Sequence, residues 1–129
     1  VRYVLHSEQG ANSLSGDGAL ETTPPGDEPA DTYLYDPEDP VPSLGGNNLT
    51  IDMGVQDQRP VEERNDVLVY TSDPLEKPLE ITGPVTVSLW ASSSAVDTGF
   101  TAKLVDVQPD GYARNLLDGI IRARYRESE

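Results

Sequence analysis

The sequence contains no cysteine and a single histidine, His6. Without thiols the chain has neither a disulfide scaffold nor a thiolate zinc site, and the redox state of its compartment is left open. A zinc site of nitrogen ligands is disfavoured too, because one imidazole cannot supply the several that such a site needs. No apolar run approaches the ~20 residues that cross a bilayer, so no transmembrane helix is expected.

Basic residues are scarce: 9 Lys and Arg stand against 23 Asp and Glu, which gives a formal net charge of −14. No Lys or Arg occurs between Arg2 and Arg59. Nucleic acids and anionic lipids are polyanions, so electrostatic repulsion disfavours both as partners. The charge favours solubility and identifies no substrate.

The first residues, Val1 to His6, are too few and too polar for a signal peptide. No initiator Met precedes Val1. We therefore expect this sequence to be part of a longer protein or a processed piece of one, and the cellular compartment is left open.

Sustained helical periodicity is also missing, whereas 11 Pro and 11 Gly favour short strands and turns. The segment from Val85 to Ala91 alternates apolar and polar residues, which predicts a strand with Val85, Val87 and Leu89 on a buried face. Other short apolar segments predict further strands, and Pro109-Asp110-Gly111 predicts a hairpin turn. The further predicted strands cover residues 1–6, 33–35, 66–72, 101–107 and 119–125.

A chain of 129 residues has the length of one domain. We predict a single all-β domain over residues 1–129, an antiparallel β-sandwich or jelly roll. Val87, Leu89 and Leu104 are expected in its core. The acidic loop from Asp27 to Asp39, interrupted by prolines, is expected to be largely exposed.

No catalytic constellation is evident in the sequence. The Gly-x-Ser-x-Gly pattern of a nucleophile elbow is absent, and the nearest serines, Ser13 and Ser15, are typical of a turn. Any acid–base role would fall on His6, which has no activated nucleophile to pair with. We therefore predict no catalytic residue, no cofactor and no metal ligand in this chain.

Three features of the sequence are candidates for a binding role. The acidic loop has oxygen ligands for calcium but lacks the ligand spacing of a known loop, so a solvated loop is favoured. Trp90, on the opposite side of its predicted strand from Leu89, favours an interface over sugar stacking. Arg122 and Arg124 share one strand face, and their expected partners are Asp97, Asp106 or Asp118.

An ordered set of motifs resembles the C-terminal region of one serine hydrolase family, which includes X-prolyl dipeptidyl-peptidases, cocaine esterase and α-amino-acid ester hydrolases. Each motif is weak alone, but together they span nearly the whole chain in the order of that family. They are Tyr3–Ser7, Gly16–Gly18, Tyr35–Pro42, Gly45-Gly46, Asp57–Arg59, Asp66–Ser72 with Pro74-Leu75, Ile81–Pro84, Phe100–Val107, Pro109–Gly111 and Gly119–Arg126.

The resemblance implies a jelly roll of the galactose-binding-like type, attached to an α/β-hydrolase domain that carries the Ser, Asp and His triad. In that family the catalytic domain precedes this region, so no triad residue transfers to this sequence and His6 is not the triad histidine. The resemblance implies that the module packs on the catalytic domain, helps to wall the active-site entrance and takes part in homo-oligomer contacts. The parent would be a dipeptidyl-peptidase or an esterase.

Two departures from the family pattern are present. Gly99 stands where the family commonly has an acidic residue. The jelly roll of the family also continues beyond Arg126, so the resemblance implies an incomplete sandwich with an open edge, prone to self-association. The alternative is an independent carbohydrate- or calcium-binding β-sandwich.

Overall fold

The computed structural model describes residues 1–49 and 53–127, and its contacts divide the chain into two compact units. Unit 1 consists of Val1–Leu44 and Asp57–Glu80. Unit 2 consists of Gly45–Gln56 and Ile81–Glu129. Each unit is described by itself below.

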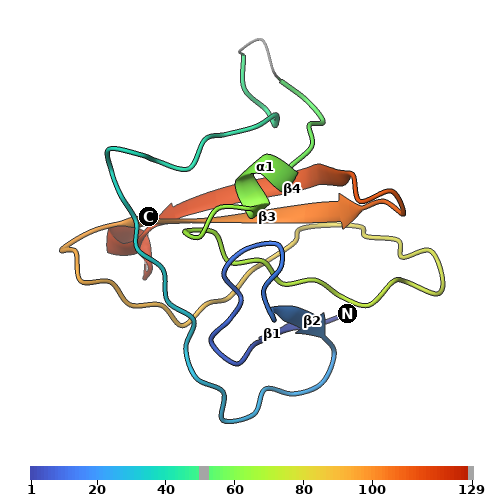
Figure 1. Ribbon diagram of the computed structural model, residues 1–129, viewed down its shortest axis with the longest axis horizontal. Coiled ribbons are helices and arrows are strands. Elements are labelled where there is room, and N and C mark those ends of the chain that lie inside the picture. Colours follow the sequence, from blue (N-terminus) through green and yellow to red (C-terminus); the bar gives the residue numbers. More distant parts are fainter. Residues whose placement is uncertain (50–52, 128–129) are drawn as a thin grey trace. The chain divides into compact units, whose positions relative to one another are not determined.

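Unit 1 contains a short antiparallel ribbon of two strands, β1 (Val4–His6) and β2 (Ala19–Glu21), in which His6 lies opposite Ala19 (Figure 1). The segment 66–72, predicted as a strand, runs alongside this region without forming a regular strand. Its backbone donates from Val69 to the carbonyl of Ala11 at 2.9 Å and from Thr71 to that of Gly18 at 3.1 Å. Unit 1 thus consists mainly of loops that are joined by isolated backbone hydrogen bonds.

A single helical turn, α1 (Arg59–Glu62), also belongs to unit 1 and was not predicted. The carboxylate of Asp57 accepts a hydrogen bond at 3.2 Å from the backbone N–H of Arg59, the first residue of the turn. Pro60 lies in the first turn, where a missing N–H costs nothing. A helix this short has no 3.6-residue period for sequence analysis to detect.

Unit 2 is built on a long antiparallel hairpin of β3 (Gly99–Val107) and β4 (Ala113–Arg122), followed by the 3-10 turn η1 (Ala123–Tyr125) (Figure 1). The predicted turn connects these strands. Gly111 has φ +84°, a conformation that glycine adopts without strain, and its N–H donates to the carbonyl of Gln108 at 2.8 Å. The pairing register shifts by a bulge between Leu104 and Val105.

One face of this hairpin is apolar. Residues that lie opposite each other in an antiparallel pair share a face, and three such pairs combine apolar side chains with one glycine: Phe100 and Ile121, Ala102 and Gly119, and Leu104 and Leu117. The opposite face carries polar pairs such as Lys103 and Asp118. We call the first set the apolar hairpin face.

The all-β, antiparallel fold class predicted from the sequence is confirmed, and the two sheets of two strands each among the described residues are consistent with an incomplete sandwich. The strand predicted over 101–107 is present as β3. The strand predicted over 119–125 instead begins at Ala113 and ends at Arg122. No strand forms over 33–35.

The strand predicted over 85–91 is wrong: these residues form no regular strand in the structure. Val87 and Leu89, which were expected in the core, have about half of their surface exposed, and Leu104 is half-buried. Alternation indicates which face of a strand would be buried, but a strand also needs a neighbouring backbone. Among the described residues, none pairs with this segment in a ladder.

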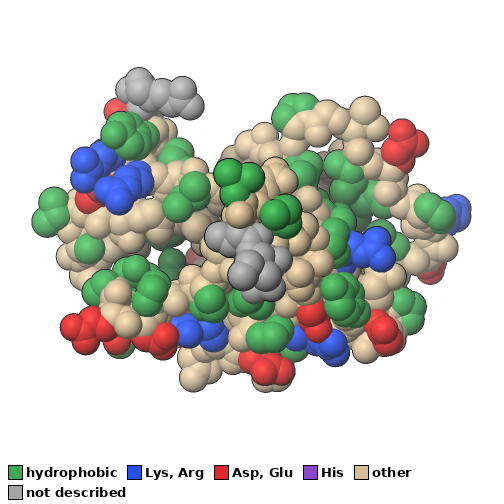
Figure 2. All heavy atoms as spheres, turned by 90° about the horizontal axis from the view of Figure 1, so that it is seen from above, with side chains coloured by type: hydrophobic (Ala, Val, Ile, Leu, Met, Phe, Trp, Pro, Cys, Tyr) green, Lys and Arg blue, Asp and Glu red, His purple; other side chains and the backbone are tan. Residues whose placement is uncertain are grey.

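The buried apolar core of the described residues is small and consists of Ala11, Val61 and Ala113. The acidic loop is exposed as predicted, except for Asp31, which is half-buried. Hydrophobic side chains therefore reach the surface in many places, as Figure 2 shows.

We predict that Gly18→Ala lowers the free energy of unfolding of the chain by about 1–3 kcal/mol, the usual cost of overpacking. A Cβ at Gly18 would lie 2.0 Å from the carbonyl oxygen of Val69, in the pairing that joins 66–72 to β2. Gly26→Ala is the matched control, because the nearest atom to its Cβ would be 3.8 Å away. Urea unfolding of both variants tests this, and equal midpoints would contradict the close approach at Gly18.

Candidate functional site

His6 lies at the end of β1, and both nitrogens of its ring face hydrogen-bond acceptors in the loop that follows β2. Nδ1 is 2.6 Å from Oε1 of Glu28, and Nε2 is 3.3 Å from the carbonyl oxygen of Thr23. The hydrogen bond to Glu28 raises the pKa of His6 above its ordinary value, and the same bond lowers the pKa of Glu28. The only histidine of the chain is thus hydrogen-bonded to a carboxylate, with which the protonated ring forms an ion pair.

The serines considered from the sequence lie in a turn, as expected. The N–H of Gly16 donates to the carbonyl of Ser13 at 3.0 Å, and Ser15 is exposed. Within residues 1–49 and 53–127, the ring of His6 bonds to Glu28 and Thr23 and to no serine hydroxyl. The geometry thus brings His6 together with a carboxylate and leaves Ser13 and Ser15 apart from it.

The carboxylate of Asp31 accepts hydrogen bonds from three donors in two segments of unit 1, residues 7–11 and 66–72. It accepts hydrogen bonds from the hydroxyls of Ser7 at 2.6 Å and Tyr70 at 2.7 Å, and from the backbone N–H of Ala11 at 3.2 Å. Burial opposes ionisation of Asp31, but these three bonds outweigh it and hold its pKa below the ordinary range. Burial and the neighbouring Asp31 raise the pKa of Tyr70.

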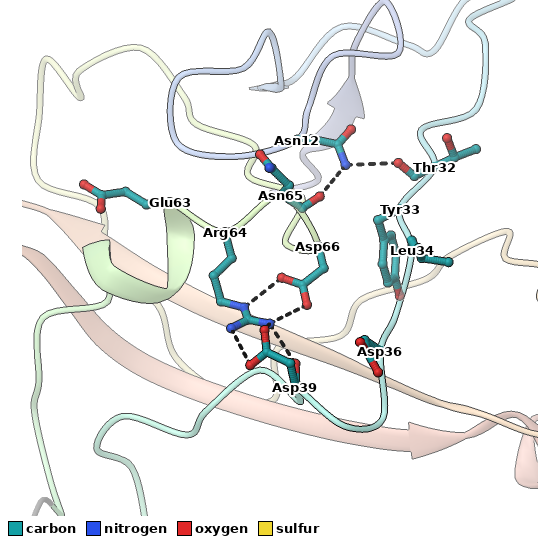
Figure 3. Close-up of a pocket in the computed structure, with 10 residues that line it drawn as sticks. All are labelled: Asn12, Thr32, Tyr33, Leu34, Asp36, Asp39, Glu63, Arg64, Asn65 and Asp66. Carbon is teal, nitrogen blue, oxygen red and sulfur yellow. Dashed lines mark hydrogen bonds and ion pairs between the residues drawn. The ribbon is translucent and has the colours of Figure 1, made fainter.

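Arg64 lies between two carboxylates at an open cleft of about 910 Å³ (Figure 3). Its Nε and Nη2 donate to the two oxygens of Asp66, each at 2.8 Å, and Nη2 also donates to the backbone carbonyl of Asp39 at 2.8 Å. The guanidinium lowers the pKa of Asp66. Asn12, on another wall, donates to the carbonyls of Thr32 and Asn65.

In unit 2, Asp97 pairs with Arg122 and Arg124. The prediction that these arginines share one strand face is wrong, because β4 ends at Arg122 and Arg124 lies in η1. Oδ2 of Asp97 is 2.7 Å from Nε of Arg124 and 3.5 Å from Nη1 of Arg122. Hydrogen bonding to Arg124 lowers the pKa of Asp97. Of the three partners expected for these arginines, Asp97 is confirmed. These side chains tie the start of β3 to the end of β4.

The clusters of Arg64 and Asp97 contain hydrogen-bonded ion pairs, whereas Asp31 binds two hydroxyls and one backbone N–H. In the described part of the chain, no group of three or more His, Cys, Asp or Glu side chains is placed to hold a metal ion. Nor does any helix there have the length and apolar character needed to cross a membrane. The hydrogen bonds of these clusters join loops that are distant in the sequence.

Comparison with known proteins identifies the family. The sequence model of the family described as "X-Pro dipeptidyl-peptidase C-terminal non-catalytic domain" matches residues 1–129. This chain belongs to that family. The resemblance inferred from the ordered motifs is thereby confirmed, and the chain is a non-catalytic C-terminal domain of the X-Pro dipeptidyl-peptidase type.

Relatives of this domain include the "Cocaine esterase" of Rhodococcus sp. (strain MB1 Bresler), with 56% identity over 128 residues. This alignment covers 98% of the chain and 22% of that esterase, so the chain spans about a fifth of the length of its relative. A second relative is the "Putative serine esterase Mb1866c" of Mycobacterium bovis, with 37% identity over 64% of the chain and 12% of that protein.

Sequence reasoning missed the residues that organise unit 1, above all Asp31 and Arg64. Asp31 was grouped with the exposed acidic loop, because its sequence neighbours are charged or proline-rich. A signal for Arg64 was available: it stands two residues before Asp66, in a region otherwise poor in basic residues. Its second partner, Asp39, lies 25 residues away and has no local signal.

We predict that Asp31→Ala lowers the stability of the chain by at least the roughly 1.5–3 kcal/mol of one hydrogen bond to a charged group. The substitution leaves Ser7, Tyr70 and the N–H of Ala11 without their acceptor. The exposed Asp27→Ala in the same loop is the control and should change stability by less than about 0.5 kcal/mol. Chemical unfolding measures both, and similar losses would show that Asp31 is no anchor.

We also predict that the chain does not hydrolyse esters or X-Pro peptides, because it lacks an activated nucleophile. The measurement is turnover of an activated ester by the purified chain and by its His6→Ala and Ser15→Ala variants. A low rate shared by all three agrees with the prediction. Turnover that either substitution abolishes would contradict it.

Proposed function

We propose that this chain is one β-sandwich domain, a jelly roll of the galactose-binding-like type, within a larger serine hydrolase that acts as an X-Pro dipeptidyl-peptidase or a cocaine-esterase-like acyl hydrolase. The domain packs on an α/β-hydrolase catalytic domain and contributes to the walls of the active site or to homo-oligomer contacts. Its own residues form an interface and take no part in catalysis.

The observation that carries this proposal is the exposure of the apolar hairpin face. Ile121 and Leu117 keep about half of their side-chain surface exposed, although both belong to a regular strand in a face without charged residues. Leaving such surface in water is unfavourable by ~25 cal/mol per Å². A second protein surface laid over this face would recover that free energy, which is how domain interfaces form.

The segment before β3 supports the same proposal. No charged residue occurs between Glu80 and Asp97, although the chain as a whole carries a net charge of −14. Val87 and Leu89 are half-exposed in this stretch, and Trp90 is fully exposed. Depletion of charge together with an exposed aromatic is the composition of an interface core. This uncharged stretch is where another surface approaches with the least electrostatic repulsion.

The chain spans only a small part of the length of the relatives that it matches. The "Cocaine esterase" that matches nearly the whole chain is several times longer, since the chain covers 22% of it. The remaining part of a similar parent would supply both the catalytic domain and the surface that covers the apolar hairpin face. In the absence of that surface, a second copy of the chain would serve as its partner.

The test places one substitution, Ile121→Ser, in two contexts: the 129-residue chain and the full-length parent hydrolase. In the chain alone we expect the free energy of unfolding to change by less than about 1 kcal/mol, since half of the side chain is already in water. In the parent we expect a loss of roughly 1.5–3 kcal/mol, the value of a buried Ile side chain.

Thr101→Ala, on the opposite face of the hairpin, is the matched control and should behave alike in both contexts. Sedimentation of the chain alone across a dilution series shows whether a second copy covers the face there. If Ile121→Ser has the same small effect in both contexts and the chain remains a monomer throughout, the apolar hairpin face is no interface and the packing proposal fails.

A further inference from the structure

The loop that follows β2 is stiff and is held at two places. We call residues 22–30 the strap. Its C-terminal end is followed by Asp31, which is anchored by Ser7, Tyr70 and the backbone of Ala11. Between its ends, the strap carries prolines at 24, 25 and 29. Because proline fixes φ, the free strap has few conformations to lose, so a small number of contacts suffices to dock it.

These contacts are centred on His6. Glu28 bonds to Nδ1, and the carbonyl oxygen of Thr23 faces Nε2. A carbonyl oxygen and an ionised carboxylate only accept hydrogen bonds, so both ring nitrogens must donate. Neutral imidazole has one N–H, whereas the imidazolium has two. The observed geometry therefore requires the doubly protonated ring.

Every charged group that faces His6 favours this state. Glu28 comes from the strap itself and Glu21 from the end of β2. Glu8 and Asp17 line the same hollow of about 180 Å³, with His6 and Glu28. All four are carboxylates. Among the described residues that line this hollow, His6 is the one side chain that can carry a positive charge.

We propose that residues 22–30 are a pH-dependent strap, closed against β1 while His6 carries two protons and released when His6 loses one. Loss of a proton removes either the bond to Thr23 or the bond to Glu28, and it leaves Glu28 beside the other carboxylates without a counter-ion. The strap then swings on Asp31 and uncovers the backbone N–H of Ser7, which bonds to Glu28 at 3.4 Å in the closed form. This inference concerns unit 1 and does not rest on the proposed function.

The pH window follows from the directions of the two shifts. The pKa of His6 is raised, so its contribution to closure is complete below the ordinary value of about 6.5 and is lost as the pH rises through the raised value. The pKa of Glu28 is lowered, so its contribution is complete above the ordinary value of about 4.3 and is lost only at lower pH. Asp31 stays ionised throughout, because its pKa is lowered too. The strap is therefore closed in weakly acidic solution and opens toward alkaline pH.

The experiment is an NMR titration of the 129-residue chain from about pH 5 to about pH 9, a range that brackets the ordinary pKa of histidine. The ring protons of His6 and the amide of Gly26 should titrate with one common midpoint above the ordinary value. Backbone order parameters of the strap should fall from near 0.85 toward 0.6 as the ring deprotonates. Glu28→Gln should shift the midpoint of His6 down toward its ordinary value, and the strap should be mobile already at low pH.

Asp27→Asn is the control: it removes one charge from the same loop, and Asp27 is exposed. This variant should keep the raised midpoint and the ordered strap at low pH. The wild-type titration decides the question even if a variant fails to fold. A midpoint of His6 at or below the ordinary value, or strap amides whose order does not change when the ring titrates, would overturn the proposal.

Discussion

The carboxylate of Asp31 accepts hydrogen bonds from Ser7, Ala11 and Tyr70, and so joins its own loop to residues 7–11 and to the segment 66–72. Such bonds are essential here because few apolar side chains are buried: in the described residues these are Ala11, Val61 and Ala113. Where packing contributes little, charge-assisted hydrogen bonds determine which loops stay in place. Arg64 has the same role between Asp39 and Asp66.

Unit 2 is organised in the opposite way. Its hairpin satisfies the backbone of β3 and β4 and places apolar side chains on one face, yet this face remains half-exposed. The alternating segment 85–91 has the sequence of a strand, yet no backbone within residues 1–49 and 53–127 pairs with it in a ladder. Both features are the basis for the proposal that another protein surface covers this unit.

Predictions from the sequence succeeded where local chemistry decides the structure and failed where long-range pairing decides it. The turn at Gly111 and strand β3 followed from φ preferences and short-range alternation. The prediction of a strand over 85–91 is wrong, because alternation indicates which side chains would be buried and does not indicate a backbone for the segment to pair with. Helix α1 escaped prediction because one turn is too short for a period, although Pro60 suits its first turn.

The sequence by itself determined the family, the acidic character, the all-β class and the lack of a Gly-x-Ser-x-Gly nucleophile, since each of these depends on residue types and their order along the chain. Only the tertiary structure decided which of many similar carboxylates matter. Asp31 and Glu28 have the same kind of sequence surroundings as Asp27, yet Asp31 is an anchor and Glu28 binds His6, 22 residues away. The reason is physical: a carboxylate acquires its role from the donors that folding brings within about 3 Å, and those donors come from distant parts of the chain.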